Sequence, residues 1–216
     1  MRTRTKYLQS VIPPSEKTSM LKPGGANKKL GDVVLKGPLL GAQLFQLSLE
    51  ERKTCPVSCL MWDNCYGDNM PFAHRFDHTD PQFYSKLEAE LWDICAKHRL
   101  VLIRLHVLGD FFSQDYVAFW ARMLRLFPHL HVFGYTAHPP CSAVGSAVDD
   151  VSSEHGWLKF AVRFSGAPMA ERAALVEDQH ASVDSFWCPE QTKQAESCAA
   201  CAACWDGKKT VRFREH

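Results

Sequence analysis

The stretch LVLIRLHVLGDFFSQDYVAFWARMLRLFPHLHVFGYTAH, residues 100–138, decides the fold. Both of its ends are apolar and rich in β-branched and aromatic residues, which is typical of strands. Between them, residues 113–128 carry apolar side chains at helical spacing, with Ser113 placed as an N-cap and Pro128 as a stop. Strand, helix and strand in this order predict a right-handed βαβ unit with parallel strands.

The same alternation continues on both sides of this unit. Short apolar runs predict strands at 42–49, 157–166 and 209–214, and helical spacing predicts helices at 81–99 and 142–155. The chain therefore predicts an α/β fold, either a partial (β/α) barrel or a curled parallel sheet. We expect an irregular basic N-terminal arm over 1–40, an α/β core over 41–187, and a cysteine-rich C-terminal cluster segment packed on the core over 188–216.

Length and composition fit a protein with one real core. The 216 residues are 46% hydrophobic and 23% charged, and no apolar run reaches the roughly 18 residues that a membrane helix needs. The first residues, MRTRTKYLQSVIPPSEK, lack the apolar centre of a secretion signal. We therefore expect a cytoplasmic protein with no membrane partner, in which thiols stay reduced. Nine cysteines in that setting indicate metal binding or catalysis rather than disulfides.

Positive charge is concentrated at the N-terminus. Residues 1–36 hold eight basic and two acidic side chains, a net charge of +6, while the whole chain carries +1. Such an arm attracts phosphate groups without sequence preference, which makes a nucleic acid or a nucleotide a candidate partner. A solvated, partly disordered arm is the alternative, because Tyr7 is the one aromatic residue there on which a base can stack.

The C-terminal cysteines form the sharpest motif in the chain. Cys198, Cys201 and Cys204 follow a CxxCxxC spacing, and Cys188 precedes Pro189 ten residues before that run. Bacterial ferredoxins combine such a run with a Cys-Pro pair to ligate [4Fe–4S] clusters. The four cysteines therefore predict a complete [4Fe–4S] ligand set, with zinc as the alternative metal.

A second cysteine set, Cys55, Cys59 and Cys65, follows the first strand of the predicted core. Three thiolates leave one iron of a cubane open, and an open coordination position is what catalysis requires. Sites in folds of this class gather at the carboxyl ends of parallel strands. Two alternatives remain: a fourth ligand supplied by Cys141, His74, His78 or the C-terminal cysteines, and two zinc sites shared among all seven cysteines.

Polar residues end three successive predicted strands. They are Gly109 and Asp110, then Thr136, then Arg163 and Ser165. Because the carboxyl ends of parallel strands meet at one edge, we predict that these residues form one rim that binds a cofactor. Turn and capping roles are the alternative for Asp110.

Arg104 and His106 alternate within the predicted strand of residues 100–110, so we expect their side chains on one face. A parallel strand covered on both faces is apolar throughout. The pair therefore indicates a barrel interior or a site, with a satisfied pair in the core as the alternative.

The chain resembles a group of uncharacterised phage and proteobacterial proteins, the phage gene product 88 type. The stretches that carry this resemblance are LSLEERKTCPVSCLMWDNCYGDNMPFAHRF, LIRLHVLGDFFSQDYVAFWARMLRLFPHLHVFGYTAH, and CPEQ with CAACAACW near the C-terminus. The resemblance covers most of residues 25–216 and implies no known activity.

The order of motifs also resembles that of the radical S-adenosylmethionine (radical SAM) enzymes. There, a first strand leads into a three-cysteine loop that binds a [4Fe–4S] cluster, and a glycine-rich acidic motif after the second strand contacts S-adenosylmethionine. By this resemblance Cys55, Cys59 and Cys65 hold that cluster, Gly109-Asp110 contacts the cofactor, and the C-terminal four hold an auxiliary cluster. This chain departs from the usual pattern, because its cysteine spacing is x3 then x5 instead of x3 then x2, and its carboxylate is Asp instead of Glu.

Three functions are therefore open. The first is a radical SAM-like enzyme that uses one or two [4Fe–4S] clusters, S-adenosylmethionine and an external electron donor. Its substrate is unknown, with a nucleotide or a nucleic acid as the candidate. The second is a zinc-binding module for nucleic acid, and the third is an iron–sulfur electron carrier or redox sensor. The CxxCxxC run favours iron over zinc, and the polar strand ends favour an enzyme over a carrier.

Overall fold

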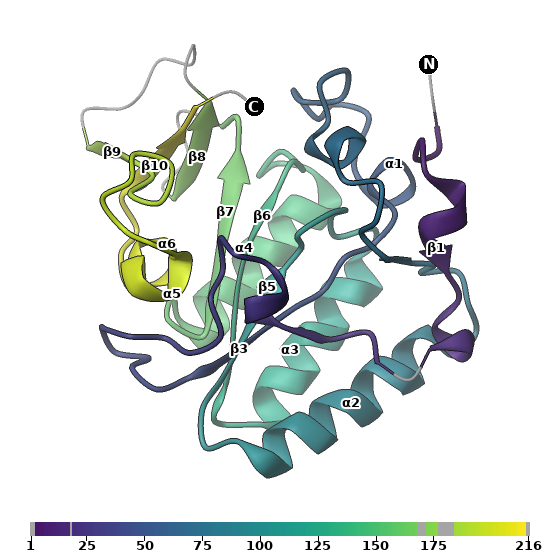
Figure 1. The fold of residues 1–216 in the computed structure, drawn as a ribbon, viewed down its shortest axis with the longest axis horizontal. Coiled ribbons are helices and arrows are strands. Elements are labelled where there is room, and N and C mark those ends of the chain that lie inside the picture. The colour runs from purple at the N-terminus through teal and green to yellow at the C-terminus, as the bar shows by residue number, and fades with distance from the viewer. Residues whose placement is uncertain (1–2, 18, 168–171, 177–183, 215–216) are drawn as a thin grey trace.

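The computed structural model describes residues 3–17, 19–167, 172–176 and 184–214 (Figure 1). The longer helices of this part are α2 (Phe83–Lys97), α3 (Gln114–Leu126) and α4 (Ala143–His155). Single helical turns are α1 (Glu51–Thr54), α5 (Cys198–Cys201) and α6 (Ala203–Asp206). Turns of 3-10 helix occur at Leu8–Ser10, Pro14–Glu16, Gly24–Ala26 and Tyr66–Asn69.

Eight strands form one sheet in the order β2-β3-β5-β6-β7-β8-β10-β9. Their bounds are Lys22–Pro23 (β2), Gln43–Gln46 (β3), Val101–Leu105 (β5), Leu130–Thr136 (β6), Phe160–Ser165 (β7), Ala173–Val176 (β8), Ser185–Trp187 (β9) and Thr210–Phe213 (β10). A separate parallel pair joins β1 (Val11–Ile12) to β4 (Arg75–Phe76). Within the large sheet only β2 runs antiparallel to its neighbour.

The prediction of an α/β fold with parallel strands is therefore confirmed in its coarse form. The sheet stays open, with β2 and β9 as its edges, and does not close into a barrel. From β3 to β8 the strands follow one another in chain order, so the loops after them leave from the same edge of the sheet.

Local signals explain where the two central helices begin. Ser113 caps α3 by accepting a hydrogen bond from the backbone N–H of Tyr116, and Ser142 caps α4 by accepting one from Gly145. Gly156 follows the last residue of α4 and has a φ of +83°. Glycine adopts this backbone conformation without steric penalty. The predicted boundaries of these elements agree with the structure to within two residues.

Two apolar layers cover the two faces of the sheet. On one face α2, α3 and α4 pack their buried side chains against strand residues such as Ile103 and Val132. On the other face Leu102 and Phe133 contact the N-terminal Val34 and the C-terminal Trp205. Figure 1 shows the yellow turns α5 and α6 and the teal helices α2 and α3 on opposite sides of the strands. Both ends of the chain thus cover the face that the helices leave open.

Some elements carry no clear sequence signal. The stretch after residue 166 is weakly patterned, yet it contains β8 and β9, and the N-terminal arm contributes β1 and β2. These strands are two to four residues long, so their pairing partners rather than their own pattern define them. Among the described residues, no helix combines the length and the apolar character needed to cross a membrane.

Candidate functional site

The first cysteine set lies in the loop that follows β3, at the carboxyl edge of the sheet. Cys55 comes directly after α1, and Cys59 and Cys65 follow in the same loop. Burial raises the pKa of all three thiols, and Cys55 interacts electrostatically with both of the others. The three thiols therefore form one cluster, and each is held in its neutral form while no metal is bound.

A fully buried arginine organises this loop. The guanidinium of Arg75 donates to Glu51 Oε2 at 2.7 Å and to Ser10 Oγ at 2.8 Å. It also donates to the backbone carbonyls of Met70, Ala73 and Gly67. Arg75 thus joins α1 to the loop around Cys65, and its donors are turned toward the protein rather than toward a ligand.

The N-terminal arm lies over the same loop. Arg4 pairs with Glu50 at 2.6 Å, and Lys6 pairs with Asp68 at 2.9 Å. The hydroxyl of Tyr7 donates to the carbonyl of Asp68 at 2.7 Å. Two of the basic residues predicted to attract nucleic acid therefore pair with carboxylates of this chain, which reduces the free positive charge of the arm.

Gly109 and Asp110 lie against the first cysteine loop. Gly109 has φ of +87°, and a Cβ atom there would lie 2.7 Å from Leu49 Cβ and from Thr54 Oγ1, so only glycine fits. The backbone N–H of Asp110 donates to Thr54 Oγ1 at 3.1 Å. Asp110 also interacts electrostatically with Cys55. Gly109 and Asp110 thus adjoin the loop that carries the first cysteine set.

The carboxylate of Asp110 already has protein partners. It accepts hydrogen bonds from the backbone N–H groups of Phe111 and Ala137, each at 2.7 Å, and one from Thr136. Burial raises the pKa of Asp110 to about 7 despite these bonds. Asp110 and Thr136 therefore connect the loop after β5 to the end of β6. This is the turn role predicted from the sequence as the alternative to cofactor binding by Asp110.

The second cysteine set lies in the C-terminal segment, which covers the face of the sheet opposite α2, α3 and α4. Ser197 caps α5 by accepting from Ala200, and Ala202, with φ of +61°, separates α5 from α6. Cys188, Cys198, Cys201 and Cys204 interact electrostatically with one another, and burial raises the pKa of Cys188, Cys198 and Cys201. A hydrogen bond of 2.9 Å joins Cys204 Sγ to the hydroxyl of Tyr135.

Arg163 holds this second set in place. It is fully buried, and its guanidinium donates to four backbone carbonyls of the C-terminal segment, those of Cys204, Lys209, Ala203 and Gly207. The expectation that Arg163 faces a cofactor at the rim therefore needs correction, because its donors are occupied by the segment that carries the cysteines. No carboxylate of the described residues forms an ion pair with it.

Among the described residues, no three His, Cys, Asp or Glu side chains are arranged to hold one metal ion.

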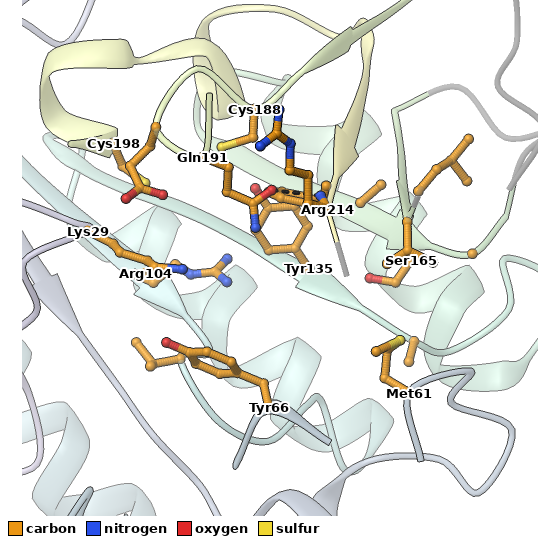
Figure 2. Close-up of a pocket in the computed structure, with 18 of the residues that line it drawn as sticks. Lys29, Met61, Tyr66, Arg104, Tyr135, Ser165, Cys188, Gln191, Cys198 and Arg214 are labelled. Atoms are coloured by element: carbon orange, nitrogen blue, oxygen red, sulfur yellow. Dashed lines mark hydrogen bonds between the residues drawn. The ribbon is translucent and has the colours of Figure 1, made fainter. Parts of the chain in front are cut away.

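A cavity of about 330 Å³ lies between the two cysteine sets. Cys59 lines it from the first set, and Cys188 and Cys198 line it from the second. Of the predicted rim, Ser165 lines the cavity, whereas Thr136 and Arg163 are buried beside it. Figure 2 shows Cys188 and Cys198 above Arg104 and Tyr135, with Tyr66 and Met61 facing them from below.

Several residues of this cavity lie outside the predicted rim. A charge inside an apolar strand is the signal for Arg104, which lines the cavity from β5. Lys29 and Tyr66 carry no such signal, because the irregular segments that hold them reach the cavity only through the tertiary fold.

The prediction that Arg104 and His106 share a face is wrong. Strand β5 ends at Leu105, so the alternation stops before His106. His106 is buried on the helical side, where its Nε2 lies 3.0 Å from the hydroxyl of Tyr116. Arg104 instead stacks on Tyr135, with its guanidinium carbon 4.3 Å from the ring centre.

His106 gives the first testable prediction. Burial, together with the charge of Arg104, lowers the pKa of His106 to about 3, so in the folded state it stays neutral well below its ordinary pKa. The unfolded chain takes up the proton first, so the free energy of unfolding falls as the pH drops below about 6.5. Below that pH, the titration of His106 alone lowers the free energy of unfolding by about 1.4 kcal/mol for each pH unit of acidification.

We expect His106→Gln to remove this slope, because glutamine cannot titrate and still hydrogen-bonds to Tyr116. Between pH 7 and pH 5 the wild type should lose about 2 kcal/mol more unfolding free energy than the variant. Urea unfolding at the two pH values measures the difference. Equal losses in both proteins would show that His106 is not held neutral.

Comparison with known proteins identifies one family and two similar phage proteins. The family model described as "Gene product 88" matches residues 20–216. The "Gene 88 protein" of Mycobacterium phage L5 is 29% identical over 170 residues, which cover 67% of this chain and 68% of that protein. The protein of the same name from Mycobacterium phage D29 is 29% identical over 171 residues, with the same coverage. No solved structure matches the chain.

Proposed function

The chain belongs to the gene product 88 family, and from that premise we propose that it is an iron–sulfur enzyme of the radical SAM type. The observation that carries the proposal is the meeting of two cysteine sets at one cavity. Residues separated by more than 100 positions, such as Cys59 and Cys198, line the same space. A carrier or a structural zinc protein needs no such cavity between its metal ligands.

The donor set of the C-terminal cysteines fits an iron–sulfur cluster. Four thiols lie within electrostatic reach of one another in a mostly buried segment, where the neutral thiol is favoured until a metal displaces the proton. Arg163 is a buried cation beside Cys204 with no carboxylate partner in the described residues. Thiolates bound to a metal carry the negative charge that a buried guanidinium needs.

The N-terminal set fits a cluster with an open iron. Besides one another, the electrostatic neighbours of its three thiols include Asp110, Glu51, Asp68 and Arg52. Cys141 is exposed, and His74 instead lies 3.2 Å from Lys22. These three cysteines would hold a [4Fe–4S] cluster whose open iron would bind S-adenosylmethionine and which, once reduced by an external electron donor, would supply the electron for its cleavage.

Three further features of the fold support the proposal: the order of the strands, the lining of the cavity and the contacts of Asp110. Strands β3, β5, β6, β7 and β8 lie side by side in chain order in one open sheet, which supports the proposal of a radical SAM-like core, and the first cysteine loop follows the first of them. Apolar side chains such as Val107 and Leu175 line part of the cavity. Asp110 holds the ends of β5 and β6 together beside the first set.

Reductive cleavage of S-adenosylmethionine tests the proposal. Anaerobically purified protein, incubated with S-adenosylmethionine and dithionite, should form 5′-deoxyadenosine, and Cys65→Ser should reduce its formation to the background level. Cys141→Ser, an exposed cysteine outside both sets, is the matched control and should keep wild-type formation. No 5′-deoxyadenosine from iron-loaded wild type would refute the radical SAM assignment.

A further inference from the structure

Arg104 is the least satisfied charge at the cavity. It extends from β5 beside Phe133 of β6, and its guanidinium lies over the rings of Tyr135 and Phe133, at 4.3 and 5.3 Å from their centres. Its Nη1 atom is buried and has no hydrogen-bond partner. Among the described residues, no carboxylate forms an ion pair with it. Burying part of a guanidinium without an acceptor is unfavourable, so a group that supplies one would stabilise this arrangement.

The geometry points to Arg104 as the anchor for the anionic group of a small organic substrate. Stacking on Tyr135 fixes the plane of the guanidinium, and a fixed planar fork suits the two oxygens of a carboxylate or a phosphate. Figure 2 shows this guanidinium pointing into the space between Tyr135 and Tyr66. The inference rests on the proposed function only for taking this cavity as the place of reaction.

Most of the charged side chains around the cavity are positive. Lys29 and Arg214 also line it, against Glu190 as the carboxylate among its lining residues. Lys29 lies over the ring of Tyr66, with Nζ 5.6 Å from the centre. The excess of positive charge attracts an anion into the cavity.

The position of Arg104 separates this anchor from the first cysteine set. Its guanidinium stacks on Tyr135, whose hydroxyl lies 2.9 Å from Cys204 Sγ of the C-terminal set. The anion is therefore expected on the side of the C-terminal set, opposite the place proposed for S-adenosylmethionine.

The rest of the cavity defines the body of the ligand. Apolar side chains such as Met61, Leu175 and Val176 and the ring of Tyr66 surround the space. Its volume of about 330 Å³ suits a molecule of the size of a mononucleotide or a short peptide end, not a folded polymer. The expected class is a small organic anion with an aromatic or apolar body.

Two matched pairs of probes test this inference by calorimetry on the anaerobically purified full chain. One pair is adenosine 5′-monophosphate and adenosine, and the other is N-acetylphenylalanine and its amide. In at least one pair the anion should bind about ten- to a hundredfold more tightly than the neutral analogue, as a charged hydrogen-bonded pair provides. The pair that shows the preference identifies the anion as a phosphate or a carboxylate.

Variants then assign the preference to Arg104. In Arg104→Met the anion and its neutral analogue should bind equally, and in Arg104→Lys part of the preference should remain because the charge stays without the fork. Arg122→Met removes an exposed arginine of α3 and should keep the full preference. If Arg104→Met does not fold, the partial loss in Arg104→Lys carries the same assignment.

Equal binding of both members of both pairs, no binding of any probe, or an unchanged preference in the Arg104 variants would each overturn the inference. These binding measurements do not require enzymatic turnover. Failure of the anion-binding inference can therefore be distinguished from failure of the proposed function. A protein that holds zinc and still prefers the anion keeps the inference and loses the radical SAM assignment. An iron–sulfur protein that does not prefer the anion would overturn the inference and leave the radical SAM assignment standing.

Discussion

Arg163→Met should lower the free energy of unfolding by about 3 to 5 kcal/mol and loosen the C-terminal segment. The guanidinium of Arg163 is the shared donor to four carbonyls between Ala203 and Lys209. Methionine fills similar volume without donors, so the carbonyls of buried Cys204 and half-buried Ala203 lose their partner, which costs about 1 to 3 kcal/mol for each group left unsatisfied. Urea unfolding followed by circular dichroism measures the loss.

Two companion variants isolate the cause. Arg163→Lys keeps the charge but cannot reach four carbonyls in one plane, so it should fall between the wild type and Arg163→Met. Arg122→Met removes an exposed arginine paired with Glu88 and should change stability by less than about 0.5 kcal/mol. An Arg163→Met protein as stable as Arg122→Met would contradict the role assigned to Arg163.

Cys65→Ser and Cys201→Ser should each remove about half of the bound iron, four of about eight atoms per chain. Cys65 belongs to the loop held by Arg75, and Cys201 to the segment held by Arg163, so each set keeps its own supports when the other loses a ligand. Iron and acid-labile sulfide are measured in anaerobically prepared protein. Cys141→Ser should keep all of the iron.

The outcome distinguishes two centres from one. Loss of all iron from either folded variant would mean a single site shared by both sets. Retention of all iron in both variants would mean that these thiols are not ligands. Urea unfolding of each variant shows whether it is folded, since a metal centre and its fold can be lost together.

The strongly patterned elements could be predicted from the sequence. The two helices with serine caps, α3 and α4, and the strands β5 to β7 beside them are defined by local periodicity and end signals, which depend little on the rest of the chain. The burial of Cys95 on the inner face of α2 follows from the same spacing. Strands β8 and β9 lack such a pattern, because they are short and depend on pairing with β10.

The site could be predicted only in its parts. Spacing groups the cysteines into two sets, but the cavity that both line arises from tertiary packing, which brings Cys59 and Cys198 together. Arg163 shows the limit of reasoning from strand ends. A charged residue at that position looks the same in sequence whether it faces a ligand or, as here, the backbone of another segment.

Iron and acid-labile sulfide per chain, measured in wild-type protein purified without oxygen, test the central claim most directly. Two [4Fe–4S] clusters predict about eight iron atoms and about eight sulfides per chain. Stoichiometric zinc with no sulfide would contradict the account.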